Sequence, residues 1–267
     1  MITFVIHYRH DSAARVENLS VVTSHFRAIA PDCKFLIVID DDKFEVPEFI
    51  SGYDDIVAVF MENDGDYNKC RGYNVGLSCV DTELVCFLDA DCIISKENLD
   101  QTIKTSLDTN MICIGYNGTC IYLTESVKSG IASMSKPGDT LYCNMDSLVS
   151  HDNIQTDYTN KHYTVGNTKA VGGCLMGKTN LFRAINGFNP NFIGWGYEDN
   201  EIISRCGKLG QQVCYINSVK PLLFHFPHEE DPNRDKGAHA YYNSNLEEVT
   251  KVEAMNKEEL QQYIKTW

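Results

Sequence analysis

The residues of this 267-residue chain that could do chemistry are short clusters of carboxylates and imidazoles. Asp89-Ala90-Asp91 follows an apolar run, and a bend there would let one carboxylate reach a ribose hydroxyl while the other binds a hard cation. His225 and His228 flank a proline turn that could bring both imidazoles onto one metal ion. Histidine with carboxylate suits a transition metal such as manganese better than calcium. An acidic turn and surface histidines are the simpler interpretations.

Gly194-Trp195-Gly196-Tyr197-Glu198-Asp199 is the most unusual segment. Glycines on both sides of a tryptophan indicate tight backbone geometry that presents an aromatic plate. Glu198 and Asp199 fall where a helix begins, and acidic residues at that point also stabilise the helix dipole. The dipole accounts for the carboxylates but not for the Gly-Trp-Gly before them.

Cationic side chains lie next to the acidic turns in the sequence. Lys69 and Arg71 fall in a helix expected over residues 67–80, and Arg9 follows the first apolar run. Most such residues face solvent. Arg9 has two candidate partners, a diphosphate or a neighbouring acidic turn.

The elements that must position these residues alternate between strands and helices. Strands are expected at residues 3–6, 35–39, 56–60 and 84–88, and helices at residues 13–29, 67–80 and 96–107. This alternation is typical of a mostly parallel sheet with helices on both faces, whose ligands bind beyond the carboxyl ends of the strands. Asp40-Asp41-Asp42 and Asp89-Ala90-Asp91 both fall at such ends, so we expect one shared crevice.

The second half of the chain is less regular. Residues 118–162 are polar and weakly periodic, which indicates a functional insertion or mobile loop. Further strands are expected near residues 111–115, 213–216 and 222–226, with order returning at residues 171–176. Helices are expected over residues 179–185, 200–209 and 246–264, the last forming the tail. Nothing marks a second independent domain.

Composition excludes several classes of protein. The formal net charge is −14, which argues against binding to nucleic acid or to an anionic membrane. Eleven cysteines without a Cys-x-x-Cys pair indicate free thiols in a reducing compartment rather than disulfides or a zinc site of the usual spacing. The first residues do not resemble a signal peptide, and no apolar stretch reaches the ~18 residues of a membrane span. We expect a soluble, cytoplasmic protein without an integral membrane segment.

Together these segments resemble the GT-A-fold glycosyltransferases. The closest resemblance is to the β-1,4-galactosyltransferase family and to the galactosyl/N-acetylgalactosaminyl transferase domains of bacterial polysaccharide polymerases. The family's Phe-Asn-Arg-Ala-x-x-x-Asn-Val-Gly segment corresponds to residues 67–76, its Asp-Val-Asp motif to residues 89–91, and its Gly-Trp-Gly-Gly-Glu-Asp-Asp run to residues 194–200. Gly172-Gly173-Cys174 and His225 with His228 match further motifs, and the order holds over residues 2–232.

The resemblance implies an α/β GT-A fold with a Rossmann-like central sheet. It implies one domain over residues 1–267, with residues 1–95 binding nucleotide and residues 96–267 binding the acceptor. It implies a metal-dependent, inverting enzyme that moves a hexose or N-acetylhexosamine, with galactose or N-acetylgalactosamine favoured, from a UDP-sugar donor to a hydroxyl of a glycan acceptor.

The resemblance also implies roles for individual residues. The implied residues are Asp91, His225 and His228 for Mn²⁺, with Mg²⁺ as the alternative; Tyr8, Arg9, Arg15, Asp40, Lys69, Asp89 and Trp195 for the donor; and Asp199 as general base with Glu198 beside it. Part of residues 118–162, or the segment after His228, is expected to order around nucleotide and metal.

Several positions depart from the family pattern and leave the acceptor and donor sugar open. Lys69 replaces an arginine and loses its bidentate fork, Tyr197 replaces a glycine, and Asn200 replaces a carboxylate. The first strand ends in His7-Tyr8-Arg9 where the family has Pro-Phe-Arg. Two alternatives remain. A sugar nucleotidyltransferase needs a glycine-rich basic loop after the first strand, and none is present. A non-catalytic carbohydrate-binding module would not need Glu198-Asp199.

Overall fold

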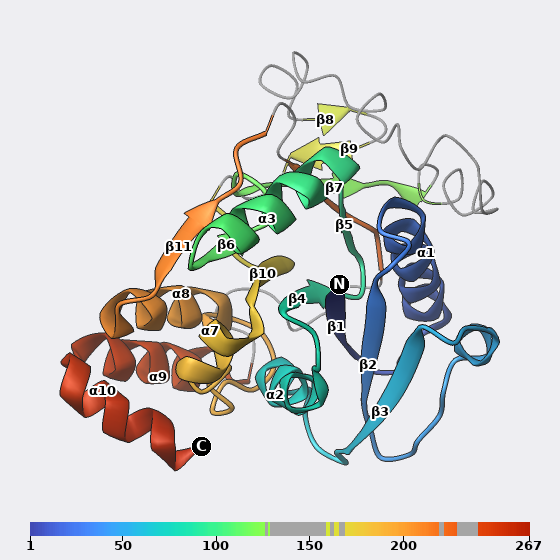
Figure 1. The fold of residues 1–267 in the computed structure, drawn as a ribbon. Coiled ribbons are helices and arrows are strands. Elements are labelled where there is room, and N and C mark those ends of the chain that lie inside the picture. The colour runs from blue at the N-terminus through green and yellow to red at the C-terminus, as the bar shows by residue number, and fades with distance from the viewer. Residues whose placement is uncertain (126–127, 129–158, 161–162, 166–168, 219–221, 229–239) are drawn as a thin grey trace.

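A computed structural model describes residues 1–125, 128, 159–160, 163–165, 169–218, 222–228 and 240–267 (Figure 1). In chain order the elements are β1 (Ile2–Tyr8), α1 (Ala13–Ile29), β2 (Lys34–Asp41), η1 (Glu48–Gly52), β3 (Ile56–Glu62), α2 (Lys69–Cys79), β4 (Leu84–Asp89), β5 (Cys92–Ile94), α3 (Lys96–Asp108), β6 (Met111–Ile114), β7 (Thr119–Leu123), β8 (Thr159–Asn160), β9 (Tyr163–Val165), β10 (Cys174–Lys178), α7 (Thr179–Ala184), α8 (Glu198–Leu209), β11 (Gln212–Tyr215), β12 (Leu222–His225), α9 (Tyr242–Ala254), α10 (Lys257–Tyr263) and η2 (Ile264–Thr266).

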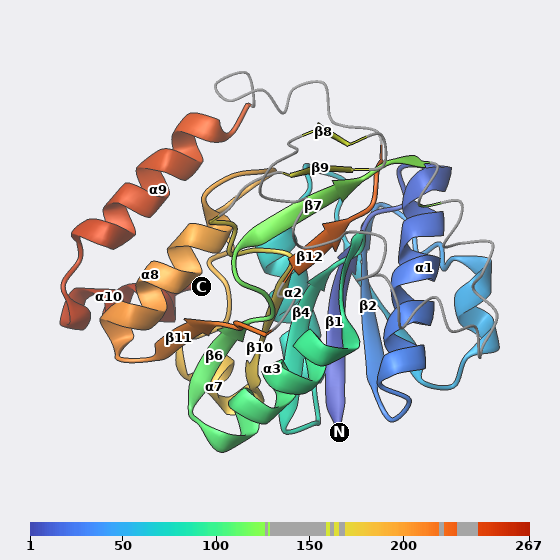
Figure 2. The same cartoon turned by 90° about the horizontal axis from the view of Figure 1, so that it is seen from above.

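The central sheet has seven strands in the order β11-β6-β10-β4-β1-β2-β3. β4, β1, β2 and β3 run parallel to one another, as do β6 and β11, whereas β10 is antiparallel to both of its neighbours. Figures 1 and 2 show α1 and α3 over one face and α2 and α7 over the other. This cover buries β1 along its whole length, which explains its continuous apolar sequence. The predicted Rossmann-like, mostly parallel sheet is confirmed, and strands from both halves of the sequence share it.

Helix α2 rests directly on β1. It begins after Asn68, whose side chain accepts a hydrogen bond from the backbone amide of Arg71 at 2.8 Å. A Cβ at Gly72 would lie 2.1 Å from the ring of His7, and one at Gly76 would lie 2.3 Å from Val5. Glycines at these two positions therefore permit the close approach, which brings the first turn of α2 to the carboxyl ends of β1 and β4.

A second, five-stranded sheet in the order β5-β12-β7-β9-β8 was not predicted. β5 is only three residues long, which is too short for its pattern to be recognised. β7 lies within residues 118–162, so the expectation of an irregular insertion is wrong for Thr119–Leu123. Most of the rest of that stretch, and the segment after His228, lie outside the described residues. Because β12 pairs with β5, the end of β12 lies beside the start of β5, next to the end of β4.

The expected tail helix over residues 246–264 is wrong in its continuity. The structure has two helices, α9 and α10, and the chain breaks between them at Asn256. The side chain of Asn256 accepts a hydrogen bond from the amide of Glu259, and the Glu259 carboxylate accepts one from the amide of Asn256. This capping box starts a new helix where the hydrophobic pattern alone continues the old one. Helix α9 lies alongside α8, as Figure 2 shows.

Candidate active site

A cavity of about 550 Å³ opens at the carboxyl ends of β1 and β4. Ten of the predicted site residues line it: Arg9, Arg15, Lys69, Asp89, Asp91, Trp195, Glu198, Asp199, His225 and His228. They come from both ends of the sequence, so the fold gathers side chains that are up to about two hundred residues apart in the chain. The other two predicted residues, Tyr8 and Asp40, are buried outside the cavity wall.

One side of the cavity brings together Asp91, His225 and His228. Nε2 of His225 lies 3.6 Å from Oδ1 of Asp91, and Nε2 of His228 lies 3.2 Å from Oδ2. The amide of Phe226 donates to the carbonyl oxygen of Asp91 at 2.8 Å, which fixes the end of β12 against the bend after β4. Burial acts to raise the pKa of Asp91, but the two imidazoles outweigh it and hold that pKa well below its usual range. The side chains that sequence reasoning grouped do converge.

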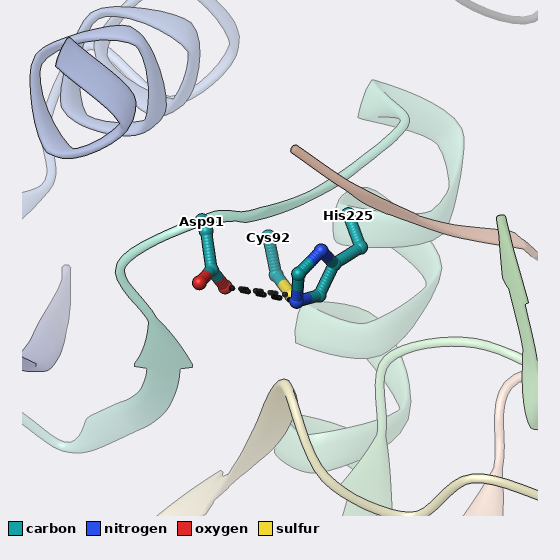
Figure 3. A group of neighbouring side chains, drawn as sticks. All are labelled: Asp91, Cys92 and His225. Carbon is teal, nitrogen blue, oxygen red and sulfur yellow. Dashed lines mark hydrogen bonds and ion pairs between the residues drawn. The ribbon is translucent and has the colours of Figure 1, made fainter. Parts of the chain in front are cut away.

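Cys92 lies in the same group and was missed by sequence reasoning. Its Sγ, a ring nitrogen of His225 and a carboxylate oxygen of Asp91 all lie within 4.8 Å of one another (Figure 3). The side chain is almost fully buried. A cysteine inside an apolar run looks like a small hydrophobic residue, and only the pairing of β5 with β12 reveals its neighbours.

Lys69 occupies the centre of a second cluster. Its Nζ lies 3.1 Å from Asp89, 3.4 Å from Asp199 and 3.8 Å from Glu198. Burial disfavours the charged ammonium group, but the surrounding carboxylates outweigh this effect and raise the pKa of Lys69. The resemblance connects Lys69 with the donor diphosphate, and the structure adds that its charge also neutralises the acidic wall of the cavity.

Glu198 and Asp199 open α8, two residues before the expected start of that helix. One carboxylate oxygen of Glu198 accepts a hydrogen bond from the amide of Gly196 at 2.9 Å. Burial and the nearby charge of Asp199 raise the pKa of Glu198 to about 7. Burial also raises the pKa of Asp199, and Lys69 opposes that shift. Carboxylates whose pKa values are raised toward neutrality are suited to accepting a proton.

Gly172 fixes the place of Asp199 and was matched by sequence only as part of a motif. A Cβ at Gly172 would lie 1.9 Å from Oδ2 and 2.6 Å from Cγ of Asp199. The carbonyl oxygen of Gly172 accepts a hydrogen bond from the hydroxyl of Tyr116 at 2.6 Å, and the carbonyl oxygen of Gly173 accepts one from the amide of Asp89 at 3.1 Å. The backbone beneath Asp199 is therefore held in place, and only a residue without a side chain leaves room for the carboxylate.

The loop before α8 presents Trp195 at the cavity, where its side chain is 38 % exposed. The amide of Gly194 donates to the carbonyl oxygen of Tyr67 at 2.8 Å, which ties this loop to the segment before α2. Tyr197 has a φ of +69°, in the left-handed region that favours glycine. Its hydroxyl lies 2.6 Å from that of Tyr242 on α9, and this contact helps to hold Tyr197 in place.

Asp40 acts from behind the cavity wall rather than within it. It is fully buried, and its carboxylate contacts His7 at 3.0 Å and Arg9 at 3.1 Å. Arg9 therefore pairs with the acidic turn, one of the two partners considered from sequence. The expectation that Asp40-Asp41-Asp42 shares the crevice with Asp89-Ala90-Asp91 is wrong, because none of these three acidic residues lines the cavity, and Asp40 instead holds Arg9 from behind. Arg15 lines the cavity and pairs with Asp11 at 3.1 Å.

Two further wall residues were missed by sequence reasoning. His7 and Tyr67 both line the cavity, and their ring centroids are 4.6 Å apart. Tyr67 replaces the phenylalanine of the family motif, and burial raises its pKa above the usual range. Nothing in the spacing of either residue distinguishes it from a core aromatic.

Comparison with known proteins agrees with this fold. Residues 19–155 match the model of glycosyl transferase family 2, and residues 153–229 match a model described as the N-terminal domain of galactosyltransferase. A search of curated proteins found no match. The solved catalytic domain of Drosophila β1,4-galactosyltransferase 7, in complex with xylobiose, is similar in fold with a TM-score of 0.52 and 13 % sequence identity. The alignment covers 96 % of this chain and 82 % of that one.

Among the described helices, none has the length and apolar character that crossing a membrane requires. The family 2 match alone spans more than half of the chain, and the fold agrees with it. The chain therefore belongs to glycosyl transferase family 2 and is a glycosyltransferase with a GT-A fold.

Proposed function

We propose that this glycosyltransferase is metal-dependent and inverting. It transfers a hexose or N-acetylhexosamine, with galactose or N-acetylgalactosamine favoured, from a UDP-sugar to a hydroxyl of a glycan acceptor. The observation that carries the proposal is the single cavity in which a carboxylate–imidazole group and a carboxylate pair with raised pKa values face the same space. The match to a galactosyltransferase model supports the choice of sugar.

Asp91, His225 and His228 would hold a divalent ion, for which we favour Mn²⁺ over Mg²⁺. The donor set fits such an ion, because an ionised carboxylate faces two imidazole nitrogens at 3.6 and 3.2 Å. Mixed imidazole and carboxylate ligands suit a transition metal better than Mg²⁺, which prefers oxygen ligands and water. A bound divalent ion would neutralise the charge that develops on the departing diphosphate.

The nucleotide would bind mainly to residues 1–95 and the acceptor mainly to residues 96–267. Asp89, at the end of β4, is suited to accept a hydrogen bond from a ribose hydroxyl. Arg9 and Arg15 would surround the nucleotide, and the buried residues Tyr8 and Asp40 would support the cavity wall from behind. Lys69 would add a positive charge on the diphosphate side while it neutralises Asp89 and Asp199.

Asp199 is our choice of general base. The oxygen of the acceptor hydroxyl attacks the anomeric carbon from the face opposite UDP and forms the new glycosidic bond. The bond from the anomeric carbon to the diphosphate oxygen breaks, UDP leaves with the electron pair, and the hydroxyl proton moves to the Asp199 carboxylate. Glu198 would orient the sugar hydroxyls, and the exposed ring of Trp195 would stack on a sugar face.

Asp199→Asn tests this assignment. A general base contributes about 10²–10⁴ in rate, so we expect turnover to fall by that factor while UDP binding is retained. UDP release from UDP-galactose and UDP-N-acetylgalactosamine with Mn²⁺ and a panel of glycan acceptors measures turnover, and calorimetry measures UDP binding. Asp100→Asn, an exposed carboxylate on α3, is the matched control. Near-normal turnover of Asp199→Asn would refute the assignment and make Glu198 the next candidate. Sugar binding without any UDP release from the wild-type protein would indicate a non-catalytic module.

A further inference from the structure

Cys92 lies where a metal ligand would lie. Its Sγ is 3.4 Å from Oδ1 of Asp91, and Nε2 of His225 is 3.6 Å from the same oxygen. Figure 3 shows the side chains of Asp91, Cys92 and His225 grouped together, with a ring nitrogen of His225 facing Asp91. The three ligand atoms fall within 4.8 Å of one another.

The fold, not chance proximity, brings the thiol to this position. Cys92 and His225 are directly opposite each other in the antiparallel pair of β5 and β12, so their side chains share one face of the sheet. A Cβ at Gly173 would come within 3.4 Å of the sulfur and 2.7 Å of Leu223, so a glycine there keeps the space around the thiol open. Cys92 and His225 also line a second cavity of about 230 Å³ that shares Asp89, Trp195, Glu198 and Asp199 with the first.

Two of the three separations among these ligand atoms match those of a tetrahedral metal site. Ligand atoms about 2.0–2.3 Å from a tetrahedral Zn²⁺ stand about 3.3–3.8 Å from one another. The distances from Oδ1 of Asp91 to the sulfur of Cys92, 3.4 Å, and to Nε2 of His225, 3.6 Å, fall within that range. The sulfur and a ring nitrogen of His225 lie within 4.8 Å of each other. His228 approaches the other oxygen of Asp91 at 3.2 Å and offers a further imidazole.

We propose that Cys92 is an additional ligand of the divalent ion, bound through its thiolate together with Asp91 and His225. The proposal rests on the metal site of the proposed function and adds that this site also binds thiophilic ions, alongside the Mn²⁺ favoured above. Thiolate and imidazole favour thiophilic ions such as Zn²⁺ and Co²⁺, whereas Mn²⁺ and Mg²⁺ favour oxygen. On binding, the S–H bond breaks, the sulfur lone pair goes to the ion and the proton is released to solvent.

The test uses Co²⁺ as a spectroscopic probe of the whole chain after treatment with a chelator. All proteins carry Cys79→Ser, because Cys79 is exposed and would bind the probe independently. The expected result is a visible cobalt spectrum together with a near-ultraviolet thiolate-to-cobalt charge-transfer band, both saturating at one equivalent. Cys92→Ser should lose the charge-transfer band and keep the visible spectrum. Cys120→Ser replaces another buried thiol of the same cavity and should change neither.

A second measurement is independent of the spectrum. We expect Cys92→Ser to lower the affinity for Zn²⁺ relative to that for Mn²⁺ by at least about 10-fold, because the soft ligand is lost. Circular dichroism reports whether the variant folds, and serine differs from cysteine by one atom.

The possible failures are distinguishable. A visible cobalt spectrum without a charge-transfer band in the parent protein would overturn the role of Cys92 and leave the metal site of the proposed function intact. Loss of the band in Cys120→Ser instead of Cys92→Ser would also overturn it. If the parent protein binds neither Co²⁺ nor Mn²⁺, with or without UDP, both the inference and the proposed metal dependence fail.

Discussion

Replacing Gly172 by alanine tests whether the position of Asp199 controls turnover. The new Cβ would lie 1.9 Å from Oδ2 of Asp199, and ordinary contact begins at 3.4 Å, so the carboxylate must move by about 1.5 Å. The backbone is held by the hydroxyl of Tyr116 and cannot easily withdraw. A 1 Å misplacement of a catalytic group can cost about 10²-fold in rate. We therefore expect kcat to fall at least about 100-fold, or about 2.7 kcal/mol in transition-state stabilisation.

The assay compares Gly172→Ala with a second glycine substitution on the same helix as Asp199. A Cβ at Gly207 on α8 meets nothing within 4 Å, so Gly207→Ala should leave kcat unchanged and stabilise the helix by about 0.5–1 kcal/mol. Turnover is followed by UDP release, and UDP binding by calorimetry. We expect Gly172→Ala to retain UDP binding, because Gly172 does not line the cavity that holds the residues proposed to bind the nucleotide.

A double-mutant cycle separates displacement of Asp199 from general damage. Asp199→Ala removes the carboxylate that Gly172→Ala displaces, so the second substitution should add little to the first. Full additivity of the two losses would mean that Gly172→Ala acts elsewhere. A kcat within three-fold of wild type in Gly172→Ala alone, with the protein folded, would refute the reasoning that the position of Asp199 controls turnover.

Three further predictions address pH, metal and stability. Asp199 must be ionised to accept a proton, and its pKa is raised, so kcat/KM should fall on the acid side at a higher pH than for an ordinary carboxyl group. Lys69→Met removes the charge that opposes this shift and should move the acid-side fall to still higher pH. Lys69→Arg keeps the charge and should not move it. An unchanged pH profile in Lys69→Met would contradict this. Removal of metal by a chelator should abolish turnover, and added Mn²⁺ should restore it. The His228→Ala variant should need more Mn²⁺ to reach its half-maximal rate. Activity that resists the chelator would contradict the metal site. Arg205→Met should lower the free energy of unfolding by about 3–5 kcal/mol in urea titrations, because it leaves the buried Glu201 carboxylate without its partner at 2.6 Å, and a loss below 1 kcal/mol would contradict that role.

The central sheet could be predicted because its strands are short, continuous apolar runs. β1, β2 and β4 are buried by helices on both faces, and each expected strand lies within the observed one. The second sheet could not be predicted in the same way. Its strands are short, and β5 begins directly after the acidic turn, so no period can develop. The split between α9 and α10 was missed because a capping box is a polar signal within an otherwise continuous helical pattern.

The candidate site was more predictable than the contacts within it. Acidic residues at strand ends had to meet at one edge of the sheet, so the approach of Asp89 to the cavity follows from the alternation of strands and helices. Sequence spacing contains no information about Gly172 and Asp199, which come from distant segments and touch only because a side chain is missing. The neighbours of Cys92 likewise depend on the register between β5 and β12, which no local pattern specifies.

The carboxylates of this cavity are divided into two sets by their surroundings. Asp91 faces two imidazoles, which keep its pKa well below the usual range and therefore keep it charged and ready to bind a cation. Burial raises the pKa values of Glu198 and Asp199, and Lys69 limits that rise. Groups of one chemical type whose pKa values are pushed apart can perform different tasks in one site. The environment, rather than the type of residue, thus supports assigning cation binding to one carboxylate and proton acceptance to the other set.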